Sequence, residues 1–159
     1  MSFASKAVRR LRSTSFRTFV VYPIVTVAWE LLVNGGWLRL QLQPVFLPLM
    51  AWGYLQYRLC GQYRIKRGGG GPGLDTPPER LVTTGPFAYT RNPMYLGHII
   101  FLTGLALTLN SLFAALLTIV TTVWFHFRVL GDERKLMQRF GPPYVAYLNN
   151  VKRWVPGLL

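Results

Sequence analysis

Four apolar runs divide the chain, and each approaches the length of a membrane-crossing helix. They cover residues 16–33, 44–60, 94–109 and 112–130. A run of roughly twenty apolar residues crosses a hydrocarbon core only as a helix, because a helix satisfies its own backbone hydrogen bonds. The pattern predicts an all-α, polytopic membrane protein with about four transmembrane helices.

The last two runs are separated only by Asn110 and Ser111. A connection this short predicts a tight helical hairpin. We expect small residues on both arms to let these two helices approach closely. They are Gly97, Gly104 and Thr108 on the first arm, and Ser111, Ala115 and Thr118 on the second. Glu30, near the end of the first run, is either an interfacial residue or a polar contact inside the bundle.

The charges give a topology. The chain has 18 Lys and Arg against 5 Asp and Glu, a net charge of +13, and 51% hydrophobic residues. Basic segments precede the first run, separate the second from the third, and follow the fourth, whereas the other two connections hold only Arg39. Four crossings place all three basic segments on one side, which the positive-inside rule assigns to the cytoplasm.

We therefore expect an integral, multi-pass membrane protein with a cytoplasmic N-terminus and C-terminus. One membrane domain would cover residues 1–159. It would comprise a basic N-terminus with the first two spans (1–60), a cytosolic loop (61–93), the helical hairpin (94–130) and a cytosolic helical tail (131–159). The Arg- and Ser-rich start, residues 1–19, anchors the first span or acts as an organelle transit peptide.

The same patterns argue against several classes of function. The basic residues flank apolar runs instead of forming one face of a soluble fold, so we expect no nucleic-acid partner. Cys60 is the single cysteine, which leaves no disulfide framework and no thiolate-rich metal site, and we expect no metal.

Gly68, Gly70 and Gly73 satisfy the letters of a dinucleotide-binding motif. That motif works only between a buried strand and a helix that holds the phosphate. Here QYRIKR precedes the glycines and the helix-hostile LDTPPER follows them. We interpret the glycines as a flexible cytosolic loop, either a plain linker or a lid over a site.

The stretch GPFAYTRNPMYLG, residues 85–97, fits the chemistry of a helix entry. Asn92 is suited to cap the helix and Pro93 to occupy its first turn, and the free backbone donors that follow suit an acceptor or an anion. Arg91 adds a positive charge, while Phe87 and Tyr95 add flat surfaces at the membrane interface. A capped transmembrane helix with an ordinary aromatic belt accounts for the same residues.

A second polar cluster lies in residues 126–141, where Arg128 ends the last run and Asp132 and Glu133 follow it. The hairpin returns this cluster to the face that carries Arg91 and Asn92. Adjacent acids near an Arg offer acceptors for ribose hydroxyls or an ammonium group and a donor for a carboxylate. A solvated surface helix is the alternative. The aromatic positions of the tail that follows indicate packing and anchoring.

Both segments, LVTTGPFAYTRNPMYLG and RVLGDERKLMQRFGPPYVAYLNNVKRWVP, resemble the isoprenylcysteine carboxyl methyltransferase and phospholipid methyltransferase superfamily of integral-membrane enzymes. The resemblance covers residues 81–156. It implies an all-helical membrane enzyme that binds S-adenosylmethionine in a cytosol-facing pocket. Such an enzyme, which needs no metal, methylates a lipophilic substrate that reaches it from the bilayer.

The resemblance also assigns residues to roles. The family's cofactor contacts fall on Leu81, Val82, Phe87, Asn92, Pro93, Met94 and Tyr95, and Arg91, Asp132 and Glu133 extend this cofactor-binding set. The family's catalytic Arg and its acidic partner fall on Arg128 and Glu133. The family's motif has a His where this chain has Asn92, which removes a titratable ring from the site. His98 is too far along the helix to replace that ring, and His126 suits a packed or interfacial position.

These assignments lead to a hypothesis. Glu133 and the donors after Asn92 hold the cofactor, and Arg128 orients either the cofactor carboxylate or an anionic nucleophile. The expected partners are membrane lipids and a lipophilic acceptor, which would be an isoprenylcysteine-like carboxylate, a phospholipid amine, or a hydrophobic thiol or acid. Two alternatives remain, an NADPH-dependent sterol-type reductase of the membrane and a non-catalytic basic membrane adaptor.

Overall fold

The computed structural model describes residues 13–35 and 40–154, and all its elements in these ranges are helical. The all-α prediction is confirmed for them. The helices are α2 (Thr14–Phe16), the π-helical turn η1 (Arg17–Val21), α3 (Tyr22–Asn34), η3 (Pro44–Phe46), α4 (Leu47–Gly68), η4 (Gly85–Ala88), α5 (Pro93–Thr108), α6 (Leu112–Phe140) and α7 (Pro142–Asn150). The predictions for residues 1–12, for Arg39 and for Pro156 lie outside the described residues.

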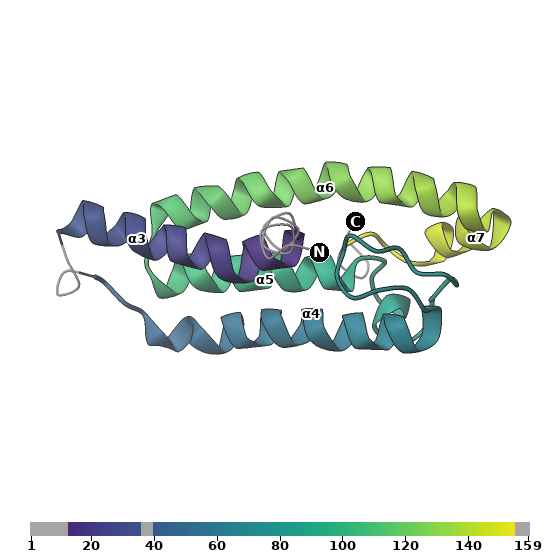
Figure 1. The fold of residues 1–159 in the computed structure, drawn as a ribbon, viewed down its shortest axis with the longest axis horizontal. Helices are drawn as coiled ribbons and strands as arrows, with labels where there is room; N and C mark the ends of the chain where they lie inside the picture. The colour runs from purple at the N-terminus through teal and green to yellow at the C-terminus, as the bar shows by residue number, and fades with distance from the viewer. Residues whose placement is uncertain (1–12, 36–39, 155–159) are drawn as a thin grey trace, which may run out of the picture.

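Helix α5 is the centre of the bundle. It packs between α4 and α6 (Figure 1). The elements α2, η1 and α3 form one continuous helix, Thr14–Asn34, which we call the first helix. Its residues Phe19 and Tyr22 cover the core residues of α5 around Leu102. His98 and Leu102 are 0% and 1% exposed. Because its neighbours shield it on several sides, α5 buries most of its own residues.

Glycines bring the backbones of α4 and α5 into direct contact. A Cβ atom on Gly53 would lie 2.5 Å from the Phe101 nitrogen, and one on Gly97 would lie 2.7 Å from the Gly53 oxygen. A Cβ on Gly104 would similarly lie 2.8 Å from the Met50 nitrogen. Gly97 and Gly104 were expected to pack the two hairpin arms together. The structure places them against α4 instead, and α4 supplies the matching glycine.

The hairpin turn is tied to the first helix. Asn110 has a left-handed backbone with φ 45°, and the Ser111 hydroxyl caps α6 by accepting from the Ala114 amide at 3.0 Å. The same hydroxyl donates to Glu30 at 2.5 Å, and the Asn34 amide donates to the second Glu30 oxygen at 3.0 Å. Glu30 therefore makes a polar contact with the hairpin turn, and this contact is compatible with both of the expected alternatives.

Two helices continue beyond the apolar runs that predicted them. Helix α4 runs past Cys60 to Gly68, and α6 runs past Leu130 to Phe140. Charged residues end a hydrophobic run, but Arg and Lys are good helix formers, so the helix continues beyond the run. Both helices stop at glycines with positive φ, Gly69 at 70° and Gly141 at 61°, because such a backbone suits only glycine well.

Two stretches of helix, Thr14–Asn34 and Leu112–Phe140, are long and apolar enough to cross a membrane. Only 11% and 22% of their apolar windows are buried, and Leu32 and Leu112 are 80% and 75% exposed. Their apolar faces therefore point outward, unlike those of core helices in a soluble protein. Of the other two predicted spans, α5 is apolar but shorter, and α4 carries several basic residues in its second half.

The contact between α4 and α5 makes a testable prediction. Gly97→Ala places a methyl group against the α4 backbone, and we expect it to lower the free energy of unfolding by about 1–3 kcal/mol or more. Gly131→Ala in α6 is the matched control, since a Cβ there meets no atom within 4 Å. The control should be neutral or stabilising by up to about 1 kcal/mol. Thermal unfolding in detergent, followed by helical circular dichroism, measures both, and equal stability of the two variants would contradict the contact.

Candidate functional site

A cavity of about 360 Å³ is lined by the loop between α4 and α5, the start of α5, the second half of α6 and α7. Figure 1 shows these elements together at one end of the bundle. Every residue that the sequence assigns to a site lines this cavity. These residues are Leu81, Val82, Phe87, Arg91, Asn92, Pro93, Met94, Tyr95, Arg128, Asp132 and Glu133. The structure thus brings both polar segments of the sequence to one hollow.

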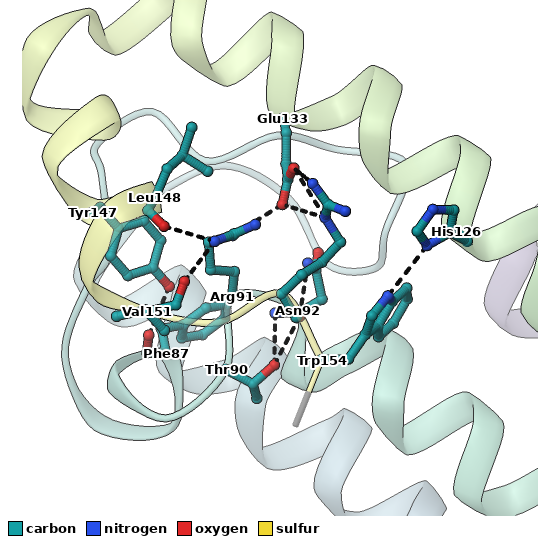
Figure 2. A network of polar contacts seen from close by, with 11 residues as sticks. Phe87, Thr90, Arg91, Asn92, His126, Glu133, Tyr147, Leu148, Val151 and Trp154 are labelled. Atoms are coloured by element: carbon teal, nitrogen blue, oxygen red, sulfur yellow. Dashed lines mark hydrogen bonds and ion pairs between the residues drawn. The ribbon is translucent and has the colours of Figure 1, made fainter. Parts of the chain in front are cut away.

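Glu133 is the centre of an ion cluster that joins three segments (Figure 2). Its side chain is 9% exposed. Arg91 Nε donates to Oε1 at 3.0 Å, and Arg153 Nη2 donates to Oε2 at 2.9 Å. Arg153 Nε also lies 3.2 Å from both oxygens. A buried carboxylate is stable only when it is paired in this way, so Glu133 connects α6 to the entry of α5 and to the chain after α7.

Arg91 also holds the end of α7. Its Nη1 donates to the Leu148 oxygen at 2.9 Å and to the Val151 oxygen at 2.5 Å (Figure 2). A cation stabilises the carbonyl groups left free at the C-terminal end of a helix. The protein therefore engages Arg91 through Nε and Nη1, and Arg91 forms part of the cavity wall.

Asn92 occupies the N-cap position of α5, with Pro93 after it, but its side chain makes no capping bond. Its amide donates instead to the Arg153 carbonyl oxygen at 3.2 Å. The Thr90 hydroxyl donates to the same oxygen at 3.0 Å and accepts a hydrogen bond from the backbone N–H of Asn92. The sequence correctly predicted Asn92 at the N-cap position. Its side chain does not form the capping bond, because it donates to the returning C-terminal segment instead.

Arg128 is held by Asp75 and Thr14. Its Nη2 donates to Asp75 Oδ1 and its Nη1 to the Thr14 hydroxyl, both at 2.6 Å. Thr14 also donates to Asp75 through its hydroxyl at 3.1 Å. The carboxylate nearest to Arg128 is thus Asp75, which the sequence did not assign to the site. Burial alone would raise the pKa of the Asp75 carboxyl, but the hydrogen bonds from Arg128 and Thr14 outweigh it, so this pKa is lowered.

Asp132 is the more open of the two adjacent acids. It accepts from the Tyr95 hydroxyl at 2.8 Å, its nearest contact to Arg128 Nε is 3.8 Å, and its side chain is 36% exposed. A carboxylate has about four acceptor positions. The two arginines occupy those of Glu133, whereas Asp132 keeps acceptor positions for a ligand.

The loop that follows the glycines lines the cavity through Leu74, Asp75, Pro77 and Pro78, and Arg64 holds this loop in place. This guanidinium donates from Nη2 to the carbonyl oxygens of Gly71, Gly73 and Thr76, at 3.1, 2.6 and 3.0 Å. Arg64 is only 8% exposed, and its burial lowers its pKa. The loop follows helix α4, not a strand, so it lacks the context of a dinucleotide-binding motif. The hydrogen bonds from Arg64 restrain this loop, whereas a plain linker would lack such contacts.

Sequence reasoning missed several residues of the wall. Tyr144 and Tyr147 line the cavity and are 2% and 7% exposed, although their spacing suggested only packing. Burial raises the pKa of Tyr144 to about 12 and also raises that of Tyr147, so both keep their protons at neutral pH. Tyr147 donates to the Phe87 oxygen at 2.6 Å. Arg64 and Asp75 also line the cavity, and both lie outside the two segments that carry the family resemblance. Arg153 lies in the second segment, but its role as a partner of Glu133 was not predicted.

Neither histidine lines the cavity. His98 is fully buried among the rings of Phe19, Tyr57 and Phe125. The Trp154 indole nitrogen lies 3.4 Å from His126 Nδ1 (Figure 2). The structure therefore offers no imidazole in place of the one that Asn92 replaces.

Two comparisons with known proteins concern this part of the chain. Residues 71–141 match the family described as phospholipid methyltransferase. The protein-S-isoprenylcysteine O-methyltransferase of Schizosaccharomyces pombe is 34% identical over 77 residues, which cover 48% of this chain and 33% of that relative. The chain thus matches about a third of the relative's length.

The link between Asp75 and Arg128 makes a prediction about pH. Because the Asp75 pKa is lowered in the folded state, its charge stabilises the fold above the ordinary carboxyl value of about 3.9. This contribution disappears as the pH falls through the lower, folded-state pKa. Asp75→Asn should therefore reduce the melting temperature at pH 7. The difference from wild type should shrink as the pH falls below about 3.9 and should vanish below the lower, folded-state pKa.

Glu79→Gln is the control, because Glu79 is an exposed acid on the same loop. It should change the melting temperature little at either pH. Thermal unfolding of the three proteins between pH 7 and pH 3 gives the comparison. A difference between wild type and Asp75→Asn that stays constant across this range would show that the Asp75 charge does not stabilise the fold.

Proposed function

We propose that the chain is a membrane methyltransferase of the phospholipid and isoprenylcysteine methyltransferase superfamily and that it uses S-adenosylmethionine. One observation carries the proposal. The residues of two separate sequence segments, 81–95 and 128–133, line a single cavity. A common binding site explains why two segments so far apart in sequence both carry polar residues at the place where they meet.

Four crossings of the membrane are part of the proposal. The first helix, α4, α5 and α6 would span the bilayer, with the cavity on the cytosolic side. The large outward-facing apolar residues of the first helix and α6 support contact with lipid. Thr14 contacts Arg128, so the first helix starts at the cavity end, where the basic residues of the loop and the tail also gather.

The cavity fits the proposed cofactor in size and lining. Ligand pockets begin at about 300 Å³, and this cavity has about 360 Å³. Its walls combine the aromatic rings of Phe87 and Tyr144 with the acceptor oxygens of Asp132. Aromatic surfaces suit an adenine ring, and a carboxylate suits ribose hydroxyls or an ammonium group.

The chemistry requires alignment above all. S-adenosylmethionine supplies a methyl group: the acceptor's lone pair bonds to the methyl carbon while the sulfur–carbon bond breaks and leaves its electron pair on sulfur. The protein aligns the two reactants and excludes water. Arg128 would hold an anionic acceptor, which would compete with Asp75 for its guanidinium.

The charge of the lining favours an anionic acceptor over an amine. The ionised lining residues are the cations Arg64, Arg91, Arg128, Lys135 and Arg139 and the acids Asp75, Asp132 and Glu133. This positive excess attracts a carboxylate or thiolate and disfavours an ammonium product. A carboxylate or thiolate also needs no base, whereas an amine must lose a proton. Proton uptake by Glu133 would break its pairs with Arg91 and Arg153.

Calorimetry with S-adenosylhomocysteine and with NADPH tests the cofactor. We expect the protein in detergent to bind S-adenosylhomocysteine and not NADPH. Asp132→Asn should weaken this binding about tenfold or more, because a hydrogen bond to a charged group contributes about 1.5–3 kcal/mol. Asp132 is a sharper probe than Glu133, because removal of Glu133 would leave two partly buried arginines, Arg91 and Arg153, without their carboxylate partner.

Arg134→Gln is the control, since it removes an exposed charge from the same helix and should leave the affinity unchanged. Binding of NADPH alone would support the reductase, and binding of neither would support the adaptor. Normal affinity in a folded Asp132→Asn protein would remove Asp132 from the cofactor site.

A further inference from the structure

A second hollow, of about 530 Å³, runs along the outside of α4 beside the segment from Pro86 to Pro93. Its α4 wall includes Trp52, Gln56, Leu59, Tyr63 and Lys66. These positions recur every three or four residues, so they form one stripe on the helix. We call this hollow the α4 groove. It shares only Pro93 with the cavity described above.

The α4 groove has the length of one leaflet of a bilayer. Trp52 and Lys66 stand at its two ends, and fourteen residues of helix span about 21 Å. Half of a bilayer with its headgroups measures about 20–22 Å. Helix α4 runs toward the cavity end, so the proposed membrane placement would put Lys66 at headgroup depth and Trp52 within the hydrocarbon.

The chemistry of the groove changes along its length. Trp52 and Leu59, at the deep end, are 53% and 51% exposed. Gln62, Tyr63 and Lys66 line the shallow end. Lys66 is exposed and is the cation of the lining, which contains no acid. An ammonium group with no competing carboxylate attracts a phosphate.

The floor of the groove consists of buried residues held by hydrogen bonds. Cys60, Thr90 and Pro93 line it and are buried. Gln56 Nε2 donates to the Pro93 oxygen at 3.0 Å, which fixes α4 to the entry of α5. The Tyr63 and Thr84 hydroxyls are 2.8 Å apart. The groove is therefore a shaped surface held by hydrogen bonds.

From its length, polarity and charge we infer that the α4 groove binds an anionic phospholipid of the cytosolic leaflet. Its phosphate would lie at Lys66 and one acyl chain would lie along Leu59 and Trp52. This inference rests on the proposed membrane placement but not on methyl transfer.

Tryptophan quenching by brominated lipids tests the inference. The whole protein is placed in phosphatidylcholine vesicles that contain either brominated phosphatidylglycerol or brominated phosphatidylcholine. We expect stronger quenching by the anionic lipid, with a relative affinity about fivefold higher, the contribution of one Lys near an anionic surface. Trp52→Phe should remove this excess, because bromine on the bound chain lies near Trp52.

Lys66→Gln should also abolish the excess, whereas Arg134→Gln, which removes an equal charge from an exposed site on α6, should retain it. Equal quenching by both lipids would overturn the inference, as would an excess that survives Lys66→Gln or Trp52→Phe. Absence of any quenching by brominated phosphatidylcholine would contradict the membrane placement itself. The cofactor measurement is independent of all these outcomes.

Discussion

The pairing of Glu133 with Arg91 and Arg153 is the interaction on which the candidate site depends. A carboxylate that is 9% exposed is stable only while both cations remain beside it. Each cation comes from a different segment, Arg91 from the entry of α5 and Arg153 from the chain after α7. Arg91 then extends the link to the carbonyl groups at the end of α7. The cavity exists because this cluster holds its walls together.

The wall on the other side depends on a close packing of helices together with charged side chains. Gly53 and Gly97 let the backbones of α4 and α5 touch, which fixes the first turn of α5 relative to Arg64 on α4. Arg64 in turn holds the glycine-rich loop, and that loop carries Asp75 to Arg128. A close helix contact inside the bundle thus determines where the loop and its carboxylate meet the cavity.

The sequence predicted the parts of this arrangement that depend on local pattern. Four helices follow from the apolar runs, and the residues from Leu81 to Glu133 that line the cavity follow from two short motifs. The ends of α4 and α6 were not predictable from hydrophobicity, because helix propensity continues through charged residues until Gly69 and Gly141. The partners of Glu133 were missed because Arg153 reaches it only after the chain reverses at Gly141. Asp75 lies in a loop whose path depends on the buried Arg64, and no spacing rule describes such a contact.

Photo-crosslinking with labelled S-adenosylmethionine tests the central claim, that the cavity between the two motif segments holds the methyl donor. The protein in detergent is irradiated with the labelled compound, and the modified peptides are identified by mass spectrometry. The account predicts label within residues 81–95 or 128–147, and S-adenosylhomocysteine but not NADPH should prevent it. Label that is confined to other regions, or that S-adenosylhomocysteine does not reduce, would contradict the account.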